Sequence, residues 1–448
     1  MLSPEWKDRV DHWIYTLSEE FYEPKGILNF EGYTTYEMLT KQEAETGPFA
    51  AMPEGTQWGR MWEYGWFKAA FTADESVSGE MLVMDIQTGG EATLFVNGEE
   101  FGTHRAEWVK EPHHYICDQV LTRKAVPGEK FHILLEAYGG HDFPDSPLGG
   151  CTTGPVREGD YAPKDPNMPR QCIGRSTWGI WHEAAYQLWL DVCMLRDLLE
   201  VTDEASLWAA KIEEALEQFT LIVDFEQPRE DRLRSYRCAR EKIHPVLEAH
   251  NGTFAPDFYA IGNAHLDICW LWPYRETQRK VARTFAQQVR LMDLYPEYKF
   301  IQSQPQSYLI CKQLYPKLYE KVKEKIKAGQ WIADGSMWVE PDTNMASGEA
   351  LIRQIIHGKR FYKEEFGVDC QLLWLPDTFG YSAVLPQILK GCGVKYLTTQ
   401  KIFWTYNGSE PFPYHYFTWQ GMDGSEIVSF LHMDYTSRTD AATVVKRW

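Results

Sequence analysis

Two short stretches carry residue types that could do chemistry together. In the first, His265 and Asp267 follow the apolar run Phe258–Gly262. Side chains at i and i+2 of an extended chain point to the same side, so an imidazole nitrogen and a carboxylate oxygen would converge there. Taken alone, such a pair is more often an ordinary hydrogen bond at a strand end. In the second stretch, Asp377 follows another apolar run, Leu372–Leu375.

A shared position at strand ends would make these residues a metal site. Active sites of parallel α/β folds lie at the carboxyl ends of strands, where both apolar runs end. Three protein ligands with an open position are typical of a catalytic metal. We therefore predict His265, Asp267 and Asp377 as the ligands. One imidazole and two carboxylates favour zinc, with manganese, cobalt and calcium as alternatives. Cys269 is a weaker candidate, because the strand is expected to end before it.

The elements that must position these ligands alternate between strand and helix from residue 258 onward. This rhythm predicts a parallel sheet covered by helices, in a barrel-like or doubly wound form. The polar pairs Gln302/Gln304 and Glu340/Asp342 also follow expected strands and could face the same cleft. The expected helices are Pro273–Leu294, Pro305–Ala328, Ser347–Phe366 and Ala383–Lys390, and the later strands are Trp331–Gly335, Gln371–Leu375, Val394–Leu397, His415–Trp419 and Ile427–Leu431.

The preceding part of the chain shows two other patterns. Residues 1–185 contain short strands separated by turn signals, among them Asn97-Gly98, which predicts a β-sandwich. Residues 186–252 change to a helical period and predict a helical linker. The α/β pattern then occupies residues 253–448.

Composition limits the partners. The 448 residues carry a net charge of −19, which argues against nucleic acid and anionic membranes. The chain has no run of 18 apolar residues, and its first residues do not resemble a signal peptide. The nine cysteines are scattered without a C-x-x-C pair, which favours reduced thiols and a cytoplasmic location.

Three ordered motifs resemble those of glycoside hydrolase family 38 α-mannosidases: Ala264–Pro273, Met337–Asp342 and Trp374–Ser382. The resemblance is greatest to the cytosolic and bacterial branch, which also carries an N-terminal β-domain and a helical linker. It is strong from about residue 258 to 432 and weak before residue 190. Residues Ala92–Glu99 separately resemble the jelly-roll domains attached to many glycosidases.

The resemblance implies a (β/α)7 barrel, one zinc ion and retaining cleavage of α-mannosides, as part of mannose metabolism. His265 and Asp267 match the first two zinc ligands. Asp377 matches both the third ligand and the catalytic nucleophile. Trp270 matches the aromatic residue that stacks on the mannose ring, and Lys401 stands where many members have a basic residue near the nucleophile.

Two further residues have an expected place in the cleft. We expect Trp338 to line it, with core packing as the alternative. We expect Asp342 to hydrogen-bond sugar hydroxyls, and Glu340 could do the same or hold a metal ligand; helix capping is the alternative for Asp342.

The resemblance leaves two roles unassigned. In the family the fourth zinc ligand is a His and the acid/base is an Asp, and both belong to a stretch expected after residue 448. His432, Asp434 and Asp440 are the nearby candidates. Because the sequence ends at Val444–Trp448 inside an expected helix, we interpret the chain as part of a longer protein. We expect this part alone to be inactive, and a homo-oligomer is a further expectation from the resemblance.

Two alternatives remain. A metal-dependent polysaccharide deacetylase would also use His and Asp ligands, but there the metal activates water, and no H-x-x-x-H follows the first motif. A carbohydrate-binding fragment without catalysis is the other. The favoured reading is a zinc-dependent retaining α-mannosidase that removes terminal α-linked mannose from oligosaccharides.

Overall fold

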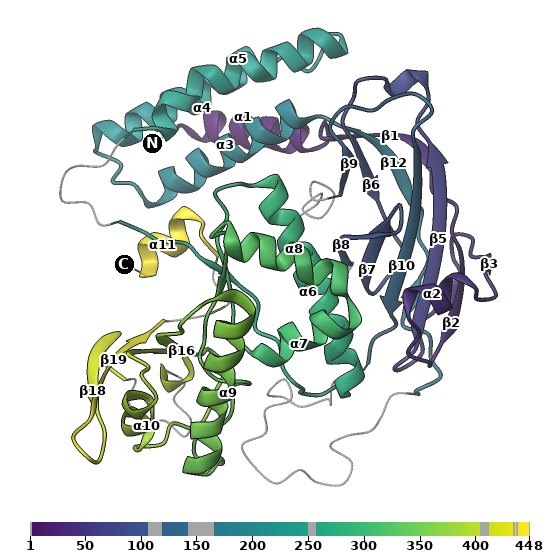
Figure 1. The fold of residues 1–448 in the computed structure, drawn as a ribbon. Coiled ribbons are helices and arrows are strands. Elements are labelled where there is room, and N and C mark those ends of the chain that lie inside the picture. The colour runs from purple at the N-terminus through teal and green to yellow at the C-terminus, as the bar shows by residue number, and fades with distance from the viewer. Residues whose placement is uncertain are drawn as a thin grey trace.

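A computed structural model describes residues 2–105, 119–141, 165–249, 257–403, 412–432, 435 and 438–447. Figure 1 shows three regions: antiparallel strands, a layer of long helices beside them, and a mixed region of strands and helices that contains the later half of the chain. Within the described residues, none of the helices is long and apolar enough to span a membrane.

The antiparallel strands form two larger sheets that share one core. Their orders are β3-β2-β5-β10-β7-β8 and β1-β12-β6-β9, and β11 pairs with β4. Phe67 and Leu135 from the first sheet pack with Met84 and Ile180 from the second. The strands are β1 (Tyr22–Ile27), β2 (Glu31–Thr35), β3 (Ala50–Ala51), β4 (Gln57–Trp58), β5 (Tyr64–Thr72), β6 (Leu82–Asp85), β7 (Glu91–Val96), β8 (Glu99–Arg105), β9 (Val120–Thr122), β10 (Lys130–Tyr138), β11 (Gln171–Cys172) and β12 (Thr177–Trp181), with α2 (Lys41–Glu45) between β2 and β3.

The hairpin expected at Asn97-Gly98 is confirmed. These two residues join β7 to β8, and Val96 pairs with Glu99 across the turn. Asn97 has φ 50° and Gly98 has φ 86°, the two positive values that a tight two-residue hairpin requires.

Four helices form the layer beside the sheets (Figure 1). They are α1 (Pro4–Ser18), α3 (Glu183–Val201), α4 (Leu207–Ile222) and α5 (Arg229–Leu247). Val10, Leu188, Leu216 and Ile243, one from each helix, lie in a common core. The first helix of the chain therefore packs with the later helices, although it belongs to the segment expected as a sandwich. The domain boundaries stay a prediction.

The mixed region confirms the alternation of strand and helix. Its sheets have the orders β13-β14-β15 and β16-β17-β19-β18, and all pairs are parallel except β18 with β19. A parallel bridge between Gly335 and Leu373 connects the two sheets. The strands are β13 (Gly262–Asn263), β14 (Phe300–Gln302), β15 (Trp331–Ala333), β16 (Leu372–Leu375), β17 (Tyr396–Thr399), β18 (Tyr416–Gln420) and β19 (Glu426–Leu431); the helices are α6 (Tyr274–Leu294), α7 (Pro305–Leu314), α8 (Pro316–Lys327), α9 (Gly348–Phe366), α10 (Leu385–Gly391) and α11 (Ala441–Arg447).

The expected (β/α)7 barrel is not found among the described strands. Their pairing leaves β13 at one edge and β18 at the other. Because β18 folds back antiparallel on β19, it ends the parallel order at that edge. The described residues thus form a mixed α/β arrangement with open sheets.

Two local predictions are wrong. The apolar run before His265 is a strand only at Gly262–Asn263, where it pairs with β14. Tyr259 is 82% exposed and forms no strand. The helix expected over Pro305–Ala328 is broken at Tyr315 into α7 and α8. Pro316 has no N–H and disfavours helical backbone in the residue before it.

Candidate metal centre

The three predicted ligands come together at the ends of two strands. His265 and Asp267 follow β13, and Asp377 follows β16. His265 Nε2 lies 3.2 Å from Asp267 Oδ1 and 3.4 Å from Asp377 Oδ2. One ligand atom from each residue lies within 4.8 Å of the other two, which leaves them able to hold one metal ion. A nitrogen and two carboxylate oxygens suit zinc and several other divalent metals.

His265 is oriented by a buried carboxylate. Glu340 Oε2 lies 3.0 Å from His265 Nδ1, and the Glu340 side chain is 5% exposed. This contact leaves Nε2 directed at the two aspartates, as in the carboxylate–histidine–metal arrangements of known metal sites. Burial alone would lower the pKa of His265, but Glu340 and Asp267 outweigh it and raise the pKa to about 10. A proton and a metal ion would therefore compete for Nε2.

Gln304 fixes the segment of Glu340 against the segment of His265. Its Nε2 donates to the carbonyl oxygen of Leu266 over 2.8 Å, and its Oε1 accepts the backbone N–H of Glu340 over 3.2 Å. Ser303 Oγ donates to Glu340 Oε1 over 2.5 Å. The two segments are thus held in register by these hydrogen bonds, of which the one to Leu266 is buried.

Asp377 has a basic and an aromatic neighbour. Lys401 Nζ lies 2.8 Å from Asp377 Oδ1, and the lysine side chain is almost fully buried. The ring of Tyr435 lies edge-on to His265 at 5.8 Å and 5.0 Å from Lys401 Nζ. Burial, followed by the charge of Asp377 and a hydrogen bond to it, raises the pKa of Tyr435. We call His265, Asp267, Asp377, Glu340 and Lys401 the metal corner.

The loop after Asp377 is braced by the segment after Glu340. Thr343 Oγ1 donates to the Gly380 carbonyl and accepts the N–H of Ser382, each over 2.8 Å. A Cβ at Gly380 would lie 1.9 Å from Asp342 Oδ1, so this position needs glycine. Asp342 Oδ1 also accepts the N–H of Asn344 over 2.8 Å, but this bond closes a turn. The capping alternative for Asp342 is wrong, because α9 begins at Gly348 and its N-cap is Ser347.

Comparison with known proteins agrees with this geometry. A model of the glycosyl hydrolases family 38 N-terminal domain matches residues 255–447. Alpha-mannosidase G of Dictyostelium discoideum is 32% identical over 87% of this chain and 34% of its own length. Human alpha-mannosidase 2C1 is 32% identical over 90% of this chain and 37% of its own length. An alpha-mannosidase of Saccharomyces cerevisiae is 41% identical over 48% of this chain and 20% of its own length.

Residues 255–447 belong to glycosyl hydrolase family 38, and the similarity to these alpha-mannosidases supports this. The chain spans about a third of the length of the first two of these curated relatives. The family match covers all members of the metal corner.

The predicted aromatic residues of this family 38 chain lie in different surroundings. Trp270 is 44% exposed, and its ring lies 6.0 Å from that of Trp272. Trp338 donates from Nε1 to Gln306 Oε1 over 2.9 Å. It lines a cavity of about 430 Å³ together with α9 side chains that include His357. Their roles towards a substrate stay predictions.

The candidates for the unassigned roles are not part of the described metal corner. Asp440 accepts from the N–H and hydroxyl of Thr443 over 2.9 and 2.8 Å, and these bonds lower its pKa, which suits a helix cap rather than an acid. His432 lies 3.1 Å from Thr398 Oγ1 and stacks on Trp374. Asp434 lies outside the described residues.

Tyr435 is the neighbour of the metal corner that the sequence reasoning missed. It follows β19, so the rule that functional groups gather after parallel strands could have found it. Gln304 and Glu340 are predicted from the sequence as polar residues at strand ends, but the sequence does not show which of them contacts a ligand.

Proposed function

We propose that this chain carries the zinc site and the nucleophile of a retaining α-mannosidase that removes terminal α-linked mannose from oligosaccharides. The observation that carries the proposal is the convergence of His265, Asp267 and Asp377 on one point in a chain of family 38. The proteins it resembles are named as alpha-mannosidases, which supports the substrate class.

Each residue of the metal corner has a proposed role. His265 Nε2, Asp267 and Asp377 hold the zinc, and Glu340 keeps the imidazole oriented from Nδ1. When bound, zinc supplies a divalent charge that can hold two neighbouring sugar hydroxyls and assist ring distortion. Lys401 orients the Asp377 carboxylate, whose oxygen attacks the anomeric carbon to form a glycosyl ester. The bond from that carbon to the glycosidic oxygen breaks in the same step, and the departing oxygen takes a proton from the acid.

The remaining parts of the mechanism rest on the family resemblance. A retaining enzyme needs a second carboxyl group about 5–5.5 Å from the nucleophile, which acts first as acid and then as base; its identity is open. We propose that Trp270 stacks on the mannose ring and that Trp338 and Asp342 contribute to the cleft. On the same basis we propose a cytoplasmic location, a homo-oligomer and a fold of the (β/α)7 type, although the described strands do not close into a barrel.

The nucleophile can be tested without the unassigned acid. A mannoside with an excellent leaving group needs little protonation, so Asp377 alone should drive glycosyl transfer. The zinc-loaded protein should release this leaving group and, with a slow fluorinated mannoside, carry a sugar on the peptide that contains Asp377. Asp377→Asn should abolish both signals, whereas Asp369→Asn, at an exposed aspartate paired with Lys359, should retain them. Turnover of the activated mannoside by Asp377→Asn would contradict the proposal. So would release of acetate from an acetylated sugar by a protein that leaves the mannoside intact.

A further inference from the structure

The sandwich and the helix that follows the first two metal ligands meet through buried charges. Helix α6 packs against β7 and β8, as Figure 1 shows. Along one side of α6, Glu276, Arg279 and Arg283 are each at most 4% exposed. On the sandwich side, Glu136 of β10 is 3% exposed. Charged groups are rarely buried to this extent unless they are paired.

These groups are paired across the boundary. Arg279 Nε lies 2.5 Å from Glu136 Oε1, and its guanidinium lies 4.3 Å from the ring of Tyr64. Tyr64 donates its hydroxyl to Glu276 over 2.9 Å. Glu91 of β7 lies 3.2 Å from Arg283. We call this set the ionic interface, with the members Glu91, Glu136, Glu276, Arg279, Lys280 and Arg283.

A short chain of contacts leads from the ionic interface to the metal corner. Lys280 Nζ lies 3.2 Å from Glu91 and 4.8 Å from the ring of Trp272. Trp272 donates from Nε1 to Thr277 Oγ1 over 2.9 Å. Thr277 is fully buried and donates its hydroxyl to the carbonyl oxygen of Asp267 over 2.9 Å. The backbone of a predicted zinc ligand is thus fixed to the same helix that the sandwich holds.

A cavity joins the same two places. It has a volume of about 360 Å³, and both His265 and Asp267 line it. Its other walls include Glu91 and Thr103 from the sandwich and Lys280 from α6. The sandwich and two of the predicted ligands therefore form walls of the same small cavity.

We propose that the N-terminal sandwich is a positioning part of the metal site, acting through Glu91 on α6 and through Thr277 on Asp267. The proposal rests on the proposed function, since it assumes that Asp267 binds the metal. It assigns no sugar-binding role to the sandwich. Thr277 and Glu91 are positioning residues: Glu91 pairs with Lys280 and Arg283 of α6, and Thr277 holds the backbone carbonyl of Asp267.

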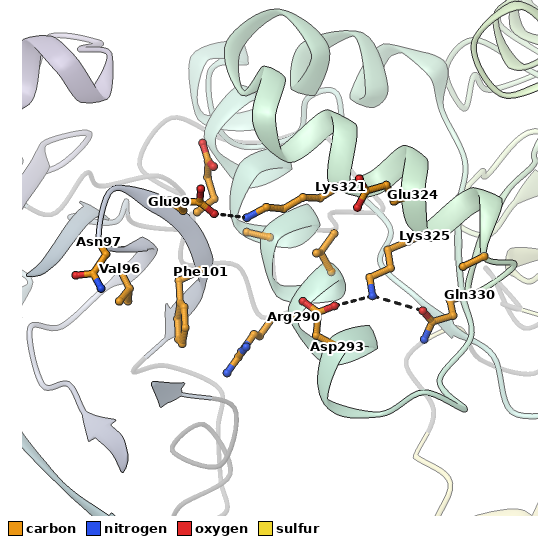
Figure 2. Close-up of a pocket in the computed structure, with 14 residues that line it drawn as sticks. Val96, Asn97, Glu99, Phe101, Arg290, Asp293, Lys321, Glu324, Lys325 and Gln330 are labelled. Atoms are coloured by element: carbon orange, nitrogen blue, oxygen red, sulfur yellow. Dashed lines mark hydrogen bonds and ion pairs between the residues drawn. The ribbon is translucent and has the colours of Figure 1, made fainter. Parts of the chain in front are cut away.

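A second contact between the same parts supplies a matched control. A cavity of about 650 Å³ lies between the β7–β8 hairpin and helices α6 and α8, and Figure 2 shows side chains that line it. There Glu99 lies 3.0 Å from Lys321 of α8, and Lys325 lies 2.6 Å from Asp293. Glu99 thus pairs across the boundary as Glu91 does, but Glu99 is itself exposed, and its partner Lys321 lies on a different helix from Thr277.

The test measures zinc affinity by competition with a chelator, together with the unfolding temperature of the metal-free protein. Thr277→Val removes the hydroxyl at constant shape, and Thr277→Ser keeps it. Since partners of metal ligands typically contribute 10–100-fold to affinity, Thr277→Val should weaken zinc binding about tenfold and Thr277→Ser should restore it to within about twofold. Glu91→Gln should weaken it by about threefold or more, and Glu99→Gln should leave it unchanged. Each comparison uses variants with a similar unfolding temperature.

The outcomes separate this proposal from the proposed function. If the unaltered protein binds zinc and Glu91→Gln binds it equally well, the sandwich does not position the site and the proposal is overturned, whatever Thr277→Val does. Equal weakening of zinc binding by Glu91→Gln and Glu99→Gln would also overturn the proposal. The loss would then follow from any weakened contact between the sandwich and the helices, and not from the contact of Glu91 with α6. If the unaltered protein binds no zinc, the proposed function fails first and this inference fails with it.

Discussion

The metal corner and the ionic interface are both built from buried and half-buried charged side chains, but their charges balance differently. At the ionic interface, three carboxylates face three cationic side chains. At the metal corner, the carboxylates of Asp267, Glu340 and Asp377 all face the imidazole of His265, and only Asp377 also faces the ammonium of Lys401 among the described residues. Buried charge without a partner is costly. The balanced charges of the ionic interface therefore suffice to join two parts of the protein. The excess negative charge of the metal corner can instead be balanced by a divalent cation.

His265 shows how the metal corner can exist without an ion. Its raised pKa of about 10 means that a proton on the imidazole offsets part of the negative charge. A divalent metal would replace that proton and bring more positive charge. We therefore expect a divalent metal to bind at the metal corner and not at the ionic interface.

The largest effect should come from unbalancing the ionic interface. Arg279→Met leaves the carboxylate of Glu136 buried without its partner, which should lower the free energy of unfolding by about 3–5 kcal/mol. Denaturant titration measures this, and replacing Glu136 with Leu as well should recover most of the loss. Arg353→Met, at an exposed partner of Glu349, should change stability by less than about 0.5 kcal/mol. Equal effects of the two single variants would show that burial of the pair is irrelevant.

The next largest effect should come from removing a ligand. Removing a ligand should lower the zinc affinity more than removing a residue that only orients a ligand. His265→Ala should therefore weaken zinc binding by more than about a hundredfold. Isothermal titration with zinc measures this. His357→Ala, at an exposed position on α9, serves as the control. Undiminished binding by His265→Ala would place the ion elsewhere.

A smaller effect should follow from freeing His265 to turn. Glu340→Gln keeps the shape but removes the charge that faces Nδ1, so zinc affinity should fall about tenfold, or about 1.4 kcal/mol. Chelator competition measures the change. Glu349→Gln, at the exposed carboxylate of the Arg353 pair, should bind zinc as the unaltered protein does. If both variants behave alike, Glu340 does not orient the ligand.

The smallest effect concerns a buried group that is kept neutral. Burial lowers the pKa of His104 on β8 to about 4, whereas an unfolded histidine titrates near 6.5. Between these values the unfolded state takes up a proton and the folded state does not, so stability falls as the pH drops through this window. From pH 7 to 5.5 this should cost the unaltered protein about 1 kcal/mol more than His104→Leu. Urea titrations at both pH values would contradict this if the two proteins responded alike.

The predicted ligands could be found from the sequence because they obey a simple rule. His265, Asp267 and Asp377 follow apolar runs, and parallel strands bring such positions to one edge. The break between α7 and α8 could also have been predicted, since Pro316 is visible in the sequence. The exposure of Phe258 and Tyr259 could not, because an apolar run does not reveal whether a neighbouring strand covers it.

The ionic interface was invisible to sequence reasoning for a physical reason. Glu276, Arg279 and Arg283 lie at positions that share one helical face, and charges on such a face usually contact water. Only packing against the sandwich buries them. The same holds for Thr277, whose hydroxyl gains its partner Asp267 through the fold and not through spacing.

The central claim is that the metal corner binds one divalent ion. Crystals of the protein grown with zinc, measured at the zinc absorption edge, test it most directly. The account predicts an anomalous peak roughly 2.0–2.2 Å from His265 Nε2 and from an oxygen of Asp267 and of Asp377. A zinc-soaked crystal with no peak at this corner, or with its ion held by other residues, would contradict the account.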